Sequence, residues 1–438
     1  MSVLFSLCFS FALLLFSASQ GYFIAYPLLL SLLLLLVAFS SQGFSIRALI
    51  TLGVASSQKA FSVVIILLMI GAVTAVWMAA GTIPALVYYG IKLVNPQYFI
   101  ISAFVLTSLI SVVLGTSFGT VGTVGVALMI MAKSGDIDPH IVAGAIIAGA
   151  YFGDRCSPMS SSANLVASLT KTKLDKNLRV MMATAWLPLI TSISIYLLLS
   201  LKHPVQIKES SFLKELVDLF EINLVILLPV AVLIILCVYQ LEVKLTLLLS
   251  FISGLLLGMF YQSYSFFEII KFTLFGFHLE SRLALSEALT EGGIMPMFKV
   301  SIVVILSTFL AGIIVGTKTL APINRFLTKA SKRSSLFFAT TTIALVAAAF
   351  GCTQTLAILM TQQLVREKYE REQLDRYQLA SDIENTAVVL SPLIPWNIAG
   401  LVPATMLMTD SGFIPYAVYL YLIPLFNFAY FKLVELQK

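Results

Sequence analysis

Charge is the scarcest property of this 438-residue sequence. Only 11% of the residues are Asp, Glu, Lys or Arg, whereas 59% are hydrophobic. A soluble domain carries about 25% charged residues, so this chain has too little polar surface to cover a globule in water. Its mean hydropathy of +0.99 fits a protein whose outer surface is covered by lipid. We therefore expect the lipid bilayer to be its main partner.

Histidine and cysteine are also scarce, which excludes several kinds of site. The three His residues are far apart and give no metal-binding spacing, and none of the four Cys residues forms a CxxC pair. The sequence has no HExxH or GxSxG motif, so we expect neither an enzyme nor a bound cofactor. The net charge of +6 is not gathered into a basic patch with aromatic residues, which argues against nucleic acid as a partner.

No Lys or Arg precedes Arg47, which decides how the apolar N-terminus is interpreted. Residues 3–19 end in Ser17-Ala18-Ser19, which faintly resembles a signal-peptide cleavage site. A signal peptide begins with basic residues, however, and a second apolar run at 22–40 follows at once. We therefore predict a helical hairpin here.

Apolar runs long enough to span a bilayer recur along the whole chain. We place them near 3–19, 22–40, 61–80, 98–114, 117–132, 141–170, 180–201, 222–239, 245–261, 297–316, 336–361, 383–408 and 413–431. Segments 83–93 and 264–290 are ambiguous. The sequence thus predicts an all-α polytopic membrane protein with about 11–13 transmembrane segments.

The distribution of Lys and Arg predicts the orientation of these segments. Loop 171–179 is strongly basic and is expected in the cytoplasm, whereas loops 133–140 and 409–412 are expected outside. Loops 325–333 and 362–382 each hold four basic residues and are expected in the cytoplasm, as is the C-terminus. Segments 141–170 and 383–408 then cross the membrane in opposite directions. The hydrophilic segment 362–382 is expected to be a solvated connecting helix.

Segments 141–170 and 383–408 are both interrupted by Ser-Pro followed by Asn. The first contains Ser157-Pro158 and Asn164, and the second contains Ser391-Pro392 and Asn397. Proline removes a backbone donor, and freed backbone groups at membrane depth must face protein or a water-filled cavity. Two similar broken helices of opposite direction indicate inverted-topology repeats, as in secondary transporters. Ordinary proline kinks are the alternative interpretation.

The repeats suggest four units along the chain. These are a helical hairpin and loop at 1–60, a first repeat at 61–201 with broken helix 141–170, connecting scaffold helices at 202–290, and a second repeat at 291–438 with broken helix 383–408.

Two carboxylates fall on these broken segments. Asp154 lies just before the first break, and Glu384 lies at the start of the second segment. A carboxylate at bilayer depth is costly, so both are candidates for binding a cation in exchange for a proton. The alternatives are that Asp154 pairs with Arg155 or lies at an interface, and that Glu384 belongs to the cytoplasmic loop.

Several stretches together resemble the NhaC-type sodium/proton antiporter family, within the wider ion-transporter superfamily. They are WMAAGTIP at 77–84, GTSFGTVGTVGVALM at 115–129, AGAIIAGAYFGDRCSPMSSSAN at 143–164, Gly292-Gly293, and SPLIPWN at 391–397. The resemblance runs from about residue 20 to the end of the chain. It implies a multi-pass transporter of the bacterial inner membrane that exchanges sodium for protons by elevator-like movement, often as a homodimer.

Combined with the broken helices, this resemblance suggests a set of ion-binding residues, with Asp154 as the principal exchange site. We expect sodium to be bound through Asp154, Ser157, Asn164, Ser391 and Asn397. The wider set of expected ion- or substrate-binding residues also includes Thr116, Ser117, Thr120, Ser161, Glu384 and Trp396.

The sequence departs from the family pattern at three acidic positions. Ser161, Thr353 and Asn385 stand where the family usually has acidic residues. A proton- or sodium-coupled transporter or exchanger of an organic acid or an amino acid is therefore the alternative function. In that case helix N-termini near Ser157 and Ser391 would face the carboxylate of the substrate.

Overall fold

The computed structural model describes most of the chain. The described residues are 3–93, 95–135, 137–204, 216–239, 241–278, 292–317, 319, 327, 330 and 332–437. Parts of the expected connecting unit 202–290 and of the basic loop 325–333 lie outside them, as does one residue of loop 133–140.

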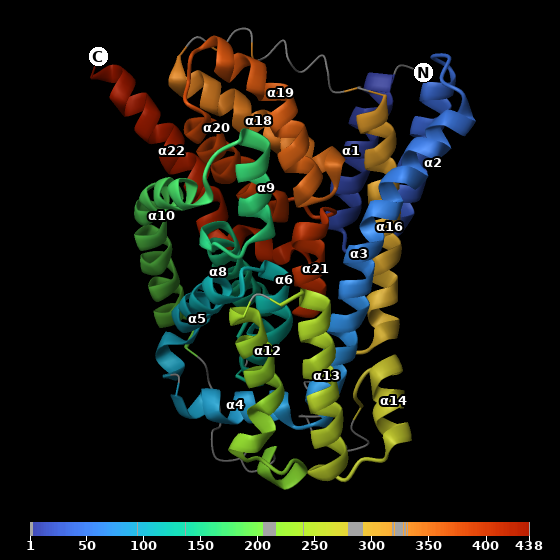
Figure 1. Cartoon of the computed structure of the whole chain (residues 1–438), viewed down its shortest axis with the longest axis vertical. Coiled ribbons are helices and arrows are strands. Elements are labelled where there is room, and N and C mark those ends of the chain that lie inside the picture. Colours follow the sequence, from blue (N-terminus) through green and yellow to red (C-terminus); the bar gives the residue numbers. More distant parts are fainter. Residues whose placement is uncertain are drawn as a thin grey trace.

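Helices make up the regular structure, and no strand forms among the described residues (Figure 1). Within these residues, seven helices are long and apolar enough to cross a membrane. An eighth span is formed if Arg376–Leu393 and Ile398–Met406, which are bent by 51° at a break, are taken together. Shorter apolar helices lie at Phe5–Ala18, Ala25–Ser40, Ser117–Lys133 and Leu224–Leu236. The predicted all-α polytopic membrane fold is confirmed.

The first broken segment belongs to a run of helices that ends at residue 202. In chain order the run comprises α5 (Phe99–Leu114), α6 (Ser117–Thr120), a π-helical turn (Val121–Gly125), α7 (Val126–Ser134), α8 (Pro139–Cys156), α9 (Ser161–Thr170) and α10 (Leu174–Lys202). The helix is therefore interrupted at Ser157-Pro158, where the sequence predicts a break.

The second broken segment belongs to a run with a similar order of elements. It comprises α18 (Arg333–Gly351), α19 (Gln354–Arg371), α20 (Arg376–Ile383), a π-helical turn (Glu384–Val388), a 3-10 turn (Ser391–Leu393), α21 (Ile398–Met406), η7 (Ser411–Tyr416) and α22 (Val418–Leu436). The hydrophilic segment 362–382 forms the end of α19 and the start of α20 instead of one connecting helix.

The second broken helix starts earlier than its apolar run predicts. It begins at Arg376 and is interrupted after Leu393. Its first three residues face outward, but the residues from Leu379 to Ile383, including the polar Ser381 and Asp382, are buried. Asp382 is buried there and pairs with Arg333, whose Nη2 lies 2.6 Å from Oδ2. Hydropathy along the sequence treats Asp382 as exposed, because it takes no account of an ion-pair partner that is distant in the sequence.

The two broken segments run antiparallel. The backbone N–H of Lys173, after α9, donates to the Tyr377 hydroxyl on α20 (3.4 Å). At the opposite ends, His140 Nε2 on α8 lies 3.0 Å from Asp410 Oδ1, which follows α21. The end of each segment therefore meets the start of the other, as their predicted opposite directions require.

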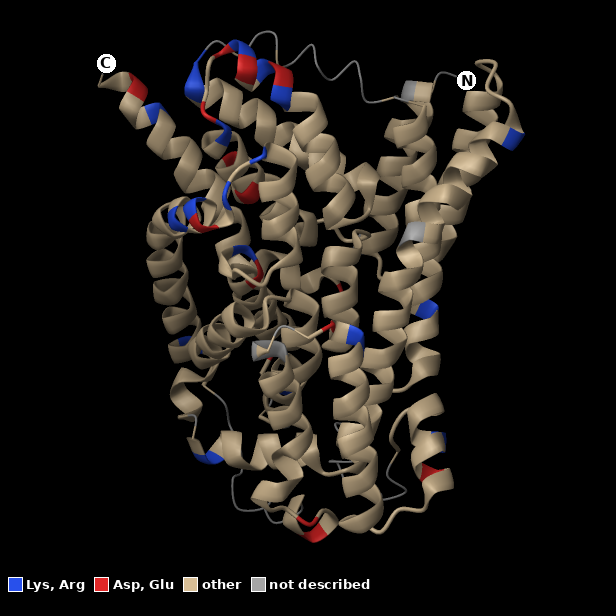
Figure 2. Ribbon diagram, viewed as in Figure 1, with Lys and Arg blue, Asp and Glu red and all other residues tan. Residues whose placement is uncertain are grey.

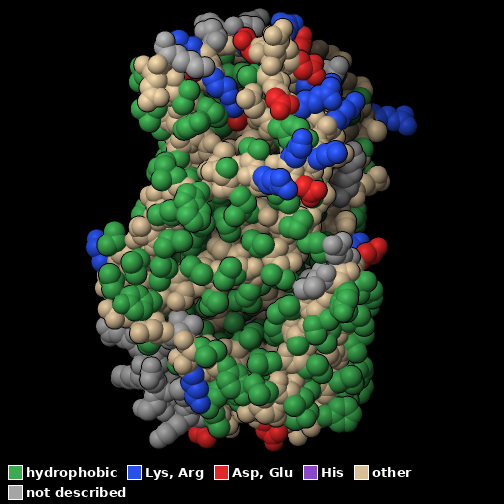
Figure 3. Space-filling view, turned by 60° about the vertical axis from the view of Figure 1, so that its left-hand side comes forward, with side chains coloured by type: hydrophobic (Ala, Val, Ile, Leu, Met, Phe, Trp, Pro, Cys, Tyr) green, Lys and Arg blue, Asp and Glu red, His purple; other side chains and the backbone are tan. Residues whose placement is uncertain are grey.

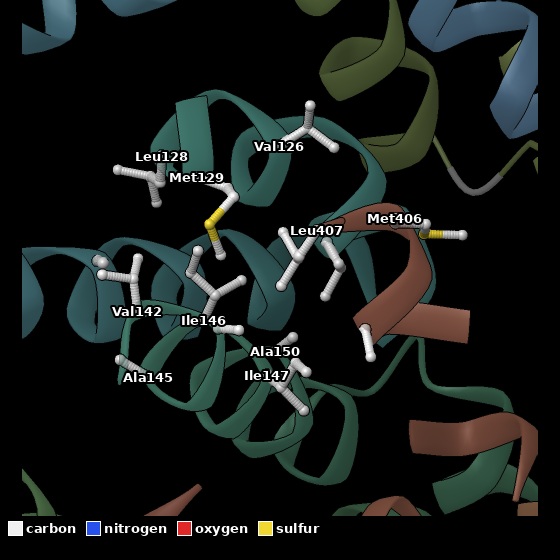
Figure 4. Close-up of a cluster of buried hydrophobic side chains, with 14 of the residues drawn as sticks. Val126, Leu128, Met129, Val142, Ala145, Ile146, Ile147, Ala150, Met406 and Leu407 are labelled. Atoms are coloured by element: carbon white, nitrogen blue, oxygen red, sulfur yellow. The ribbon is translucent and has the colours of Figure 1, made fainter. Parts of the chain in front are cut away.

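Small residues let α8 pack closely on α5. A Cβ added to Gly149 would lie 2.2 Å from Thr107 Oγ1, and one added to Gly153 would lie 2.3 Å from Ser111 Cβ. Ser111 Oγ donates to the Ala150 carbonyl (2.5 Å), which adds a polar contact to this interface. The other face of α8 is apolar and packs with α7 and the end of α21 (Figure 4).

The remaining helices flank these two runs. α3 (Ile46–Ala79) and α16 (Ile294–Gly316) pack antiparallel, since Gly293 N–H donates to Gly71 O (2.7 Å) and Ser57 Oγ donates to Ile305 O (3.2 Å). The predicted N-terminal hairpin is seen as α1 and α2, which pack together. Further helices among the described residues are α1 (Val3–Ser19), α2 (Ala25–Ser40), α4 (Thr82–Leu93), α12 (Leu228–Val238), α13 (Val243–Phe260) and α14 (Phe266–Phe275).

Charged residues gather at one end of the molecule. This end carries both termini and the turn between α19 and α20 (Figures 1 and 2). Hydrophobic side chains cover much of the body below it (Figure 3). The sequence predicts that this end faces the cytoplasm, because its loops are rich in Lys and Arg, and this orientation stays a prediction.

Candidate functional site

A cavity of about 670 Å³ lies where the two runs of helices meet. Its polar lining comes from both: Thr116 and Ser117 at the start of α6, Asp154, Ser161 and Asn164 around the first break, and Thr353, Gln354 and Thr355 at the start of α19. Ile398 and Ala399, at the start of α21, complete this wall. Residues more than 200 positions apart in the sequence thus share one cavity.

Matching chain reversals create the two inner corners of the cavity. Gly115 ends α5 with φ = 66°, and Thr116 then caps α6 by accepting from Gly119 N–H (3.4 Å). Cys352 ends α18 with φ = 56°, and Thr353 then caps α19 by accepting from Leu356 N–H (3.1 Å). Left-handed backbone is easy for glycine and strained for cysteine.

The break between α8 and α9 is organised by serines. Ser157 has extended backbone and its Oγ accepts from Met159 N–H (3.1 Å), which turns the chain at Pro158. Ser160 then caps α9 by accepting from Ala163 N–H (3.2 Å). Ser and Thr are favoured at this position because their side chains satisfy a free N–H group of the first turn.

Asp154 lies in the last turn of α8, is only 4% exposed and reaches the cavity. Ser160 Oγ donates to its Oδ1 (2.8 Å), and Ser117 Oγ lies 3.4 Å from its Oδ2. Ser162 Oγ lies 2.8 Å from Ser160 Oγ. The carboxylate is therefore surrounded by hydroxyl groups. Among the described residues that line the cavity, Asp154 is the only charged one.

Arg155 points away from Asp154 and links α8 to three other elements. Its guanidinium donates to Thr184 Oγ1 (2.8 Å) and Met181 O (3.1 Å) on α10, to the side-chain oxygen of Asn385, and to the Tyr419 hydroxyl on α22 (3.4 Å). Asp154 and Arg155 therefore do not form an ion pair, and that alternative is wrong.

Glu384 is fully buried in the π-helical turn and does not belong to a cytoplasmic loop. Neither of its carboxylate oxygens has a hydrogen-bond partner among the described residues, and it does not line the cavity. It directly precedes Asn385, whose side-chain oxygen accepts from the Arg155 guanidinium, so a positive charge lies nearby. Arg155 therefore offsets part of the cost of this buried carboxylate.

Three candidate residues of the second break use their polar atoms on backbone groups. Ser391 Oγ donates to Ala387 O (2.6 Å), and Trp396 Nε1 donates to Ala349 O (2.7 Å). Asn397 caps α21 through Ala399 N–H (2.9 Å) and donates to Ala348 O (2.8 Å). All three are buried and none lines the cavity.

Of the other candidate residues, some line the cavity and some do not. Ser161 and Asn164 line the cavity, and Asn164 Nδ2 also holds the break by donating to Ser160 O (2.7 Å). Ser157 and Thr120 do not line it; Thr120 Oγ1 donates to Thr116 O (2.8 Å). The structure therefore brings Asp154, Ser161, Asn164, Thr116 and Ser117 together around one space.

Two features of the site were not anticipated from the sequence. Ser160 is the hydroxyl nearest to Asp154, and it could have been found as the capping residue before Ser161. The helix starts that face the cavity lie at Ser161 and Gln354, and not at Ser157 and Ser391.

Comparison with known proteins gives a consistent set of relatives. The sequence model of the Na+/H+ antiporter family matches residues 1–163 and 149–432. A malate-2H(+)/Na(+)-lactate antiporter from Bacillus subtilis is 27% identical over 381 residues, covering 85% of this chain and 81% of that protein. The Na(+)/H(+) antiporter NhaC from Alkalihalophilus pseudofirmus is 29% identical, covering 82% and 79% respectively. An arginine/ornithine antiporter from Halobacterium salinarum is 26% identical, covering 81% and 75%.

Proposed function

The chain belongs to the Na+/H+ antiporter family, and we propose that it exchanges sodium ions for protons at Asp154. It is a multi-pass membrane protein, and its relatives are transporters by name. The observation that supports this site is that, of the lining residues that the structure describes, only Asp154 brings a charge into a cavity shared by both broken regions.

The chemistry around Asp154 suits a sodium ion. Sodium is a hard cation that prefers oxygen ligands, and Asp154 is surrounded by the hydroxyl groups of Ser160 and Ser117. Thr116, Ser161 and Asn164 add further oxygen atoms on the same wall. A carboxylate that holds either a proton or a sodium ion, but not both, couples the two fluxes because each must leave before the other binds.

The fold offers a way to expose this site to each side in turn. The two broken regions have a similar order of elements and run antiparallel, which supports an inverted repeat. In that arrangement the helices that carry Asp154 move as one body against the scaffold helices α3 and α13, which form the opposite wall of the cavity. Glu384 is a second candidate for carrying a proton, and a homodimer stays a prediction that light scattering can test.

Reconstitution into liposomes tests this function. With the protein present, an imposed sodium gradient should create or dissipate a pH gradient, and potassium should not replace sodium. Asp154→Asn should abolish the exchange, whereas the exposed Asp138→Asn should not. Absence of sodium-dependent proton movement in well-folded wild-type protein would rule the proposal out.

A further inference from the structure

The cavity beside Asp154 has two chemically different walls. The wall formed by the two broken regions is polar. The opposite wall is aliphatic and comes from α3 and the region around the start of α13, with Val63, Ile66, Ile70, Leu241, Val243 and Leu247. An inorganic ion gains nothing from an aliphatic surface, because its ligands are oxygen atoms and water.

The volume of the cavity also exceeds what sodium needs. A sodium ion with a shell of six waters would occupy about 200 Å³, at about 30 Å³ for each water. The cavity measures about 670 Å³, within the range of roughly 300–1,000 Å³ that is typical of sites for small organic ligands.

The charge of the polar wall determines whether an organic cation or an organic anion binds in the cavity. Asp154 places a buried carboxylate in this wall, and the part of the lining that the structure describes includes no Lys, Arg or His. An organic anion would therefore meet a negative charge and no positive side chain. An ammonium group would instead find a carboxylate and several hydroxyl acceptors.

We propose that the cavity also takes an organic ammonium ion with a short aliphatic chain. The ammonium group binds at Asp154, and the chain lies against the aliphatic residues of α3 and of the α13 region. This inference shares only one element with the proposed function, namely that Asp154 is the cation site. The first turns of α9 and α19 also face the cavity, so a carboxylate on the same molecule is tolerated there.

Three probes with the same branched chain separate the contributions. Leucine carries both charged groups, isoamylamine lacks the carboxylate, and isocaproate lacks the ammonium group. Binding to purified protein is measured by calorimetry and by thermal stabilisation. Isoamylamine and leucine should bind to the wild type and fail to bind to Asp154→Asn. Binding of isocaproate alone, or of none of the three probes, would overturn the inference.

A second measurement needs no variant and tests the aliphatic wall. In the series from methylamine to butylamine, affinity should rise by about fourfold for each methylene group that becomes fully buried. Equal affinities along the series would contradict a role for the aliphatic wall. Each amine should also raise the sodium concentration needed for half-maximal exchange.

The outcomes distinguish this inference from the proposed function. Sodium/proton exchange without amine binding would leave the proposed function intact and remove the inference. Amine binding that requires Asp154, in a protein without sodium/proton exchange, would support the inference and remove the proposed function.

Discussion

Replacing Gly149 with Ala should weaken the contact between α8 and α5 that holds Asp154 in place. The new Cβ would lie 2.2 Å from Thr107 Oγ1 and 2.5 Å from Phe104 O, whereas ordinary contacts begin at 3.4 Å. Neither atom can move easily. The Thr107 hydroxyl already donates to the backbone of its own helix (2.7 Å to Ala103 O), and the Phe104 carbonyl is part of that backbone.

The magnitude follows from how far the helices must separate. Relief of the two contacts requires α5 and α8 to move apart by about 1 Å along a buried interface. Overpacking of this kind costs about 1–3 kcal/mol. The higher helix propensity of Ala offsets up to about 1 kcal/mol of that cost. We therefore expect a net loss of about 1–2 kcal/mol in the free energy of unfolding, with Asp154 displaced from Ser117.

Thermal unfolding in detergent, followed by size-exclusion chromatography, measures this loss. Gly90→Ala on α4 is the matched control, because its Cβ would meet only the flexible thioether of Met131 at 3.0 Å. The control should be neutral or slightly stabilising. A Gly149→Ala protein that is as stable as Gly90→Ala would refute the close packing of these two helices.

Three further predictions concern polar contacts of the two runs of helices: two of these contacts join the runs, and one lies within the second run. His140→Cys combined with Asp410→Cys should be joined by a short thiol cross-linker, as detected by mass spectrometry, because the native side chains are 3.0 Å apart; failure to react would contradict the antiparallel arrangement. Arg333→Met should lower stability by about 3 kcal/mol, since it leaves buried Asp382 without its ion-pair partner and with only the Tyr369 hydroxyl as a neutral donor. Unchanged thermal unfolding would contradict this. Asn385→Leu should lower the free energy of unfolding by about 2 kcal/mol, because it removes an acceptor of Arg155. Asn385→Asp keeps an oxygen at this position and should not have this cost. Equal stabilities of the two variants would contradict the role of Asn385 as an acceptor.

The general architecture could be predicted because the bilayer imposes strict rules. Apolar length gives the spans, and Lys and Arg give their direction. The Ser157-Pro158 break was visible since proline cannot continue the helix on which Asp154 lies. The antiparallel arrangement of the two broken segments followed from these signals together.

The use of individual polar residues could not be predicted in the same way. Ser391, Trp396 and Asn397 have the residue types of ion ligands, but they donate to backbone carbonyls of the π-helical turn and of the end of α18. Ser160 looked like one of several equivalent serines, yet it both caps α9 and donates to Asp154. Such distinctions depend on which atoms the tertiary structure brings within reach.

Proton release upon sodium binding tests the central role of Asp154 most directly. Sodium is titrated into purified protein by calorimetry in two buffers that differ in ionisation enthalpy. If sodium displaces a proton from Asp154, the heat of binding should differ between the buffers in the wild type, and Asp154→Asn should give no sodium-binding heat in either buffer. Buffer-dependent sodium binding that persists in Asp154→Asn would contradict the account.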